Sequence, residues 1–144
     1  MQQKAVLDLE QVNRILDAAQ REAEGNSWPV TIAVTDDGGH LLALRRLNGC
    51  APMASYVAPE KARSAALGRR ETQAFEDMIN GGRTAFLSAP VLQGLLTGGI
   101  PVVHEGQVIA AVGVSGVKPE QDAQVARAGI AALTVMAAAG HPER

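Results

Sequence analysis

Apolar residues recur at spacings of three and four between Asp8 and Glu24, which is the period of an amphipathic helix. Asp8 and Gln11 are spaced to form a capping box at its start, and Gly25-Asn26 supplies a stop. The pattern therefore predicts a helix from Asp8 to about Glu24 that buries one face. Its apolar stripe consists of Leu9, Val12, Leu16, Ala19 and Ala23.

Two shorter apolar runs follow this helix. Residues 30–35 are rich in β-branched side chains, and residues 40–46 form a second run that begins with His40 and ends with Arg45-Arg46. The connection Asp36-Asp37-Gly38-Gly39 has the composition of a turn. Such a short connection predicts an antiparallel β-hairpin.

The middle of the chain favours helices with breaks between them. Residues 55–67 are alanine-rich, but Pro59 cannot donate a backbone hydrogen bond. This helix should therefore either kink or start near Ala58. Residues 73–79 predict a short second helix. Residues 83–97 are ambiguous, and a helical turn packed on the core is suggested by Val91, Leu92, Leu95 and Leu96.

Residues 98–116 predict a second hairpin, with two apolar strands joined by a tight turn at Glu105-Gly106. Pro119 then fits the first position of a last helix, which should end near Gly140 and His141. One face of this helix carries small residues that allow close approach to a sheet or to another subunit. That face consists of Ala126, Gly129, Ile130, Leu133 and Ala137.

The predicted order is helix, two strands, two or three helices, two strands and a helix. Antiparallel hairpins with helices gathered elsewhere favour an α+β fold over a doubly wound parallel sheet. The chain length of 144 residues fits one domain, residues 1–144, that can bury a core without disulfides.

Composition narrows the function. Hydrophobic residues make up 47% of the chain but aromatic residues only 3%, so the core must be aliphatic. A net charge of −2 without a basic block argues against nucleic acid as a partner. No apolar run reaches the roughly 20 residues of a membrane span, and the N-terminus lacks a secretory signal, so we expect a cytoplasmic protein. The single Cys50 excludes an internal disulfide and a multi-cysteine zinc site.

Three histidines are candidates for chemistry. His40 and His104 flank the two predicted turns, and His141 lies in the tail. None is paired at metal-ligand spacing, so a zinc or non-haem iron site is not expected. A single imidazole can still bind haem iron axially. The commoner role for each of them is that of a partly exposed turn residue.

Other candidates have two interpretations each. Ser115 lies in an incomplete nucleophile elbow, because Val117 stands where a glycine is needed. Its simpler role is a hydroxyl near a helix N-terminus that caps the helix or contacts an anion. Lys61 and Arg45 either form part of a solvated surface or hold carboxylates in a pocket.

Several segments together resemble the GlcG/HbpS-like haem-binding family, which also occurs as the C-terminal domain of PduO-type corrinoid adenosyltransferases. The likeness extends over about residues 5–138. The matching pieces are Asp36-Asp37-Gly38-Gly39-His40-Leu41 with Arg46, Lys61-Ala62-Arg63-Ser64-Ala65-Ala66, Gly98-Gly99-Ile100-Pro101, residues 106–116, Gln121-Asp122 and Val125-Ala126.

The resemblance implies a profilin-like or PAS-like α+β fold, with an antiparallel sheet of about five strands and helices packed on it. It also implies dimers or larger oligomers and, in some members, haem as a bound cofactor. If haem binds, His40 and His104 are the candidate iron ligands, with Lys61 or Arg45 near a propionate. The chain departs from the family at Asn48-Gly49-Cys50, where Asp-Gly-Ala is common, and at Pro59.

Haem binding for sequestration, sensing or slow degradation is therefore the first hypothesis. The second is an enzyme, such as an isomerase, tautomerase or lyase, that acts on an organic acid. In that hypothesis Lys61, Arg45 and the helix N-terminus near Ser115-Gly116 would bind a carboxylate, while His104 or Glu105 moved protons.

A non-catalytic accessory module is the third hypothesis, suggested by the small-residue face from Ala126 to Ala137. We interpret Gly99, Ser115 and Gly116 of the second hairpin as one wall of a pocket, and not as a nucleotide loop or a serine nucleophile. We expect a small-molecule ligand and a homo-oligomer, with no nucleic acid and no membrane as partner.

Overall fold

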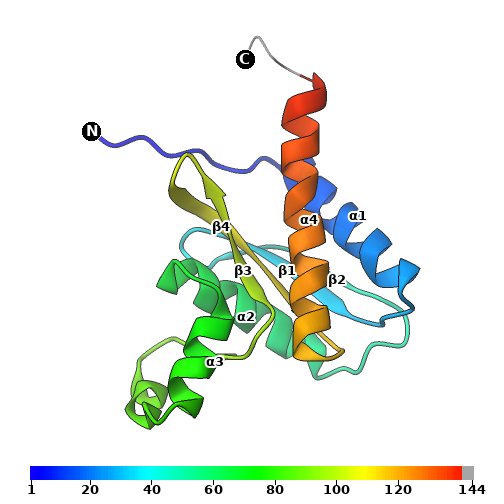
Figure 1. Ribbon diagram of the computed structural model, residues 1–144. Helices are drawn as coiled ribbons and strands as arrows, with labels where there is room; N and C mark the ends of the chain where they lie inside the picture. Colours follow the sequence, from blue (N-terminus) through cyan, green and yellow to red (C-terminus); the bar gives the residue numbers. More distant parts are fainter. Residues whose placement is uncertain (141–144) are drawn as a thin grey trace.

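A computed structural model describes the backbone of residues 1–140 and the side chains of residues 1–133 (Figure 1). The predicted chain end at His141 lies outside the described residues. Both predicted hairpins and the first and last helices are present. The elements are α1 (Leu9–Gly25), β1 (Thr31–Asp36), β2 (Leu41–Arg46), α2 (Ala54–Gly68), α3 (Thr72–Asn80), the 3-10 helix η1 (Thr84–Ser88), β3 (Gly99–His104), β4 (Gln107–Ser115) and α4 (Pro119–Gly140).

The strands form one antiparallel sheet in the order β2-β1-β4-β3. The described residues contain four strands, where the family resemblance implied about five. Each hairpin contributes one central and one edge strand. At the β3–β4 turn, Glu105 and Gly106 have φ values of 49° and 78°. Two successive left-handed residues are typical of the tight turn that matches the twist of a hairpin.

Helices cover both faces of the sheet. In Figure 1, α1 and α4 lie side by side on one face, and α2 lies on the other. Strand β1 alternates accordingly, because Ile32 and Val34 belong to the aliphatic core under α1 and α4, whereas Ala33 belongs to an alanine cluster under α2. The size of the side chains on each face of β1 therefore sets how far the helices on that face lie from the sheet. This arrangement confirms the predicted α+β fold.

Helix α2 packs with its backbone directly against the middle of the sheet. Gly99, Gly113 and Ala33 are neighbours across three strands. A Cβ atom on Gly113 would collide with the backbone of α2 at Ala58, and one on Gly99 would collide with the backbone at Lys61. The absence of side chains at these two positions is thus what allows the close approach.

The start of α2 differs from one predicted alternative. The helix begins at Ala54 and runs through Pro59, so the predicted start near Ala58 is wrong. The backbone N–H groups of residues 54–57 donate to the carbonyl oxygens of residues 51–53. The first turn therefore forms upstream of Pro59 and needs no N–H from it. It ends at Gly68, and Arg69 follows in the left-handed conformation with φ 56°.

The first helix has the predicted capping box between Asp8 and Gln11. Its apolar stripe is shifted, however, because Leu9 is 69% exposed while Ile15 is fully buried. Ile15 is buried because α4 lies against it, and a Cβ atom on Gly129 would lie 2.9 Å from the Ile15 carbonyl oxygen. The small-residue face of α4 therefore approaches α1 of the same chain, at least up to Leu133.

The segment between α3 and β3 also departs from its prediction. The helical turn lies at η1, residues 84–88, and not at residues 91–96, which are irregular. Phe86 provides the reason, since its ring stacks on Phe75 of α3 with centroids 5.2 Å apart. The aromatic contact anchors the turn earlier in the chain than the leucines suggested.

A buried ion pair joins α2 to the start of α4. Lys61 is 3% exposed, and its Nζ donates to the carbonyl oxygen of Val114 at 2.9 Å and to Asp122 Oδ2 at 3.1 Å. The other carboxylate oxygen of Asp122 accepts from the backbone N–H of Val117 at 3.1 Å. Burial raises the pKa of Asp122, and the nearby Lys61 ammonium and the Val117 N–H only partly oppose this.

Gly113→Ala should lower the free energy of unfolding by about 2 kcal/mol, because the added methyl group pushes α2 off the sheet. Gly25→Ala is the matched control, since a Cβ atom there would meet nothing within 4 Å. Urea unfolding of both variants measures the difference. Equal stabilities for the two variants would contradict the close packing of α2.

Lys61→Met should destabilise the fold by about 3 kcal/mol at neutral pH, because it leaves the Asp122 carboxylate buried and alone. The folded chain then holds a proton on Asp122 at pH values where the unfolded chain has lost it, so the stability falls as the pH rises above the ordinary Asp range. Thermal unfolding between about pH 5 and pH 8, where most proteins are at their most stable, measures this slope.

The double variant Lys61→Met with Asp122→Asn is the control for that experiment. It removes both charges but keeps an acceptor for the Val117 N–H. It should recover most of the lost stability and show no extra pH dependence. A double variant that is no more stable than Lys61→Met would show that the pairing of charges is not what matters.

Candidate functional site

The predicted site residues lie at two opposite ends of the sheet. The β1–β2 and β3–β4 turns share one end, which we call the turn end, and it carries His40, His104 and Glu105. The other end, which we call the helix end, is where β4 runs out toward α4. Ser115 pairs there with Thr31 at the start of β1. The structure therefore does not bring all the predicted residues into one pocket.

At the helix end, four predicted residues are engaged in packing. Lys61 binds Asp122, and Gly99 contacts the backbone of α2. Ser115 is buried in the sheet, and Gly116, with φ 143°, lies against Pro29 and Cys50. None of the four lines any of the cavities described below. The expected anion position at the start of α4 is already taken by the Asp122 carboxylate, which accepts from Val117.

His40 lies on the first turn and is held by a carboxylate. Its Nδ1 is 3.0 Å from Asp36 Oδ1, and the same oxygen accepts from the backbone N–H groups of Gly38 and His40 at 2.9 Å. Slight burial acts to raise the pKa of Asp36, but these donors outweigh it and lower the pKa overall. The His40 side chain is 81% exposed and lines none of the described cavities.

His104 lies beside the largest described cavity. That cavity, of about 760 Å³, occupies the turn end between the end of α2, the β3–β4 hairpin and the N-terminal segment. A smaller cavity of about 340 Å³ is lined by His104 and Glu105. The two adjoin, because both are lined by Gln3, Lys4 and Gln107. The imidazole of His104 is 55% exposed, with Glu105 Oε1 3.8 Å from its Nε2.

Two cations that the sequence did not single out border this space. Lys4 Nζ lies 2.7 Å from Asp37 Oδ2, and Arg69 Nη2 lies 3.7 Å from the same carboxylate oxygen. Arg69 also donates to the carbonyl oxygen of Ala66 at 2.7 Å, which holds it at the C-terminus of α2. Two cations share one carboxylate, so the rim of the cavity carries an excess positive charge. No local motif reveals them, because they come from the N-terminal segment and a helix end.

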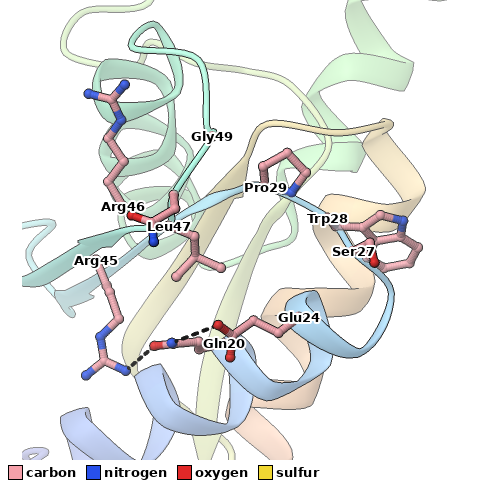
Figure 2. A pocket seen from close by; sticks show the side chains of 10 residues that line it. Gln20, Glu24, Ser27, Trp28, Pro29, Arg45, Arg46, Leu47 and Gly49 are labelled. Atoms are coloured by element: carbon pink, nitrogen blue, oxygen red, sulfur yellow. Dashed lines mark hydrogen bonds between the residues drawn. The ribbon is translucent and has the colours of Figure 1, made fainter.

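Arg45 lies at a separate cavity of about 550 Å³ between α1, the end of β2 and the loop after it (Figure 2). Its Nη1 donates to Asp17 Oδ1 and Gln20 Oε1, both at 2.9 Å. Figure 2 shows Arg46 directed the other way, where its Nη2 donates to the carbonyl oxygen of Cys50 at 2.8 Å. The two adjacent arginines therefore serve opposite faces of the sheet.

The described residues contain no group of three or more His, Cys, Asp or Glu side chains that could hold a metal ion. Cys50 is buried, with its Sγ 3.3 Å from Thr31 Oγ1. Within residues 1–140, no helix has the length and apolar character needed to cross a membrane.

Comparisons with known proteins place this geometry in a family. Protein GlcG of Escherichia coli strain K12 is 57% identical over 115 residues, which cover 80% of this chain and 85% of GlcG. Among solved structures, the PduOC:heme complex has a TM-score of 0.81 at 27% identity and covers 89% of this chain and 95% of that one. A double mutant of Streptomyces reticuli HbpS has a TM-score of 0.81 at 30% identity, with coverage of 98% and 92%.

A family model described as "Haem degrading protein HbpS-like" matches residues 7–131. This range includes α1, every strand of the sheet and the beginning of α4. The match and the close likeness to GlcG agree with the segments that carried the resemblance in the sequence. The chain belongs to the HbpS-like family.

Proposed function

We propose that this protein binds one haem at the turn end, with His104 as an iron ligand and with Lys4 and Arg69 beside the propionates. The observation that carries the proposal is the grouping of an accessible imidazole with two cations around two adjoining cavities. Membership of the HbpS-like family and the likeness to the PduOC:heme complex support it. The Glu105 carboxylate lies 3.8 Å from His104 Nε2, which is an ion-pair distance and too long for a hydrogen bond.

The residues of the turn end fit the needs of a haem. A haem requires an axial donor, cations for two carboxylates and apolar contact for the ring. The turn end offers the imidazole of His104, the charges of Lys4 and Arg69, and the side chains of Val103 and Val108. Its cavity also has the size of a small-molecule site, which is roughly 300–1,000 Å³. Bound haem would supply an iron centre for ligand binding and electron transfer.

The other candidates from the sequence fit less well. Lys61 is buried against Asp122, so it is not accessible to a propionate. Arg45 lies on the α1 side of the sheet and is held by Asp17 and Gln20. His40 remains accessible, but no described cavity reaches it. We therefore prefer His104 to His40 as the iron ligand.

Among the possible roles of a haem protein, the open site favours sequestration over degradation. Enzymes ordinarily protect reactive intermediates by excluding water from the site. His104 is more than half exposed, and the N-terminal segment covers the site with residues that are themselves exposed. Such a site suits reversible uptake and release of its ligand.

Titration of the purified protein with hemin tests the iron ligand. We expect a Soret shift that saturates near one haem per chain. His104→Ala should weaken binding by more than the roughly tenfold to hundredfold lost when an outer partner of a metal ligand is removed. His40→Ala is the matched control and should bind like the wild type. Unchanged binding by His104→Ala, or loss of binding only in His40→Ala, would refute the assignment.

The cations are tested by a second comparison, between hemin and its dimethyl ester. Lys4→Gln and Arg69→Gln should weaken hemin binding and reduce its dependence on salt, because each removes a charge that attracts a propionate. Neither variant should weaken binding of the uncharged ester. Arg14→Gln, on the exposed surface of α1, is the control for net charge. An equal loss for hemin and ester would argue against contacts with the propionates.

A further inference from the structure

The cavity at Arg45 is independent of the proposed haem site, because it lies at the helix end of the sheet and shares no lining residue with the turn-end cavities. Its volume of about 550 Å³ lies within the usual range of small-molecule sites. Its lining residues are Gln20, Glu24, Ser27, Trp28, Pro29, Arg45, Arg46, Leu47, Asn48 and Gly49.

A fixed guanidinium group forms one end of this cavity. Strand β2 directs Arg45 toward α1, where Asp17 and Gln20 hold its Nη1. Nε and Nη2 make no hydrogen bond within the part of the chain whose side chains are described. Asp17 offsets part of the charge, but its side chain is 53% exposed and therefore well solvated. A guanidinium held in this way has donors ready for a carboxylate.

A carboxylate lies at the other end. Gln20 accepts from Arg45 with its Oε1 and donates from its Nε2 to Glu24 Oε2 at 3.3 Å. One glutamine side chain therefore spans the distance between a cation and an anion, as Figure 2 shows. Both groups belong to the lining of the same cavity. A ligand that matches them carries a carboxylate and an ammonium group several bonds apart.

The remaining wall is apolar. Pro29 and Leu47 lie across from the row of polar groups, and Trp28 lies beside Ser27 at the Glu24 end of the cavity (Figure 2). Trp28 and Leu47 are also partly buried against the aliphatic core, which gives the wall a rigid support. An apolar wall beside two opposite charges suits a molecule with a hydrocarbon body and charged ends.

From this geometry we propose that the cavity between α1 and β2 binds an amphipathic zwitterion, an amino-carboxylic acid with a hydrocarbon body. Its carboxylate contacts Arg45, its ammonium group contacts Glu24, and its body lies against Trp28 and Leu47.

The fluorescence of Trp28 tests this directly, because it is the only tryptophan of the chain. The probes are 6-aminohexanoate, hexanoate, which lacks the ammonium group, and hexylamine, which lacks the carboxylate. We expect a saturable change in emission, with 6-aminohexanoate binding more tightly than either of the other two. No saturable change with 6-aminohexanoate, or equal binding of all three probes, would overturn the proposal.

Two variants test whether Arg45 binds the carboxylate of the ligand and Glu24 its ammonium group. Arg45→Gln should weaken binding of 6-aminohexanoate and hexanoate by roughly tenfold or more and leave hexylamine unchanged. Glu24→Gln should weaken binding of 6-aminohexanoate and hexylamine and leave hexanoate unchanged. Arg21→Gln, a nearby residue of α1 that does not line the cavity, is the control and should have no effect. Weaker hexanoate binding in Glu24→Gln, or weaker hexylamine binding in Arg45→Gln, would contradict the assignment.

Arg45 also ties β2 to α1, so Arg45→Gln could fail to fold. In that event Arg45→Lys, which keeps the charge but loses the planar fork, takes its place and should bind the two carboxylates more weakly than the wild type does. Glu24 is exposed, and its replacement leaves the core intact. Hemin binding should be unchanged in Glu24→Gln, which separates failure of this site from failure of the haem site.

Discussion

The contact between the backbone of α2 and the middle of the sheet is the constraint on which the rest of the structure depends. Gly99 and Gly113 leave no side chain between the two, and alanines fill the remaining space. Because α2 lies so close to the sheet, the side chain of Lys61 reaches the carbonyl oxygen of Val114 and the carboxylate of Asp122. A helix held further out would not place that ammonium group beside the first turn of α4.

This packing also decides where ligands can bind. The middle of the sheet is covered by α2 on one face and by α1 and α4 on the other, so the residues at its centre are buried. The accessible polar groups are therefore found around the ends of the strands. His104 lies at one end and Arg45 toward the other, and each is bordered by groups from a helix as well as from the sheet.

Local patterns predicted the elements well but the site only in part. The capping box at Asp8 and the glycine turn of the second hairpin act within a few residues, so the sequence reveals them directly. The partner of Lys61 lies 61 positions away, and the exposure of Leu9 depends on where α4 packs. Such relations arise from tertiary packing, which periodicity does not record. The sequence gives no sign that Lys4 and Arg69 lie together, because tertiary packing alone brings them to the same cavity.

The scarcity of aromatic residues has a consequence for the proposed haem site. Phe75 and Phe86 stack on each other, and Trp28 lines the cavity at Arg45, so none of these three rings lines the turn-end cavity. Haem held there would rest on valines and gain little from aromatic stacking. Coordination by His104 and attraction to Lys4 and Arg69 would then dominate its affinity. The attraction to the two cations depends on solution conditions, since salt screens exposed charges. A site built in this way would release its haem when the ionic strength rises, in keeping with the reversible uptake and release proposed above.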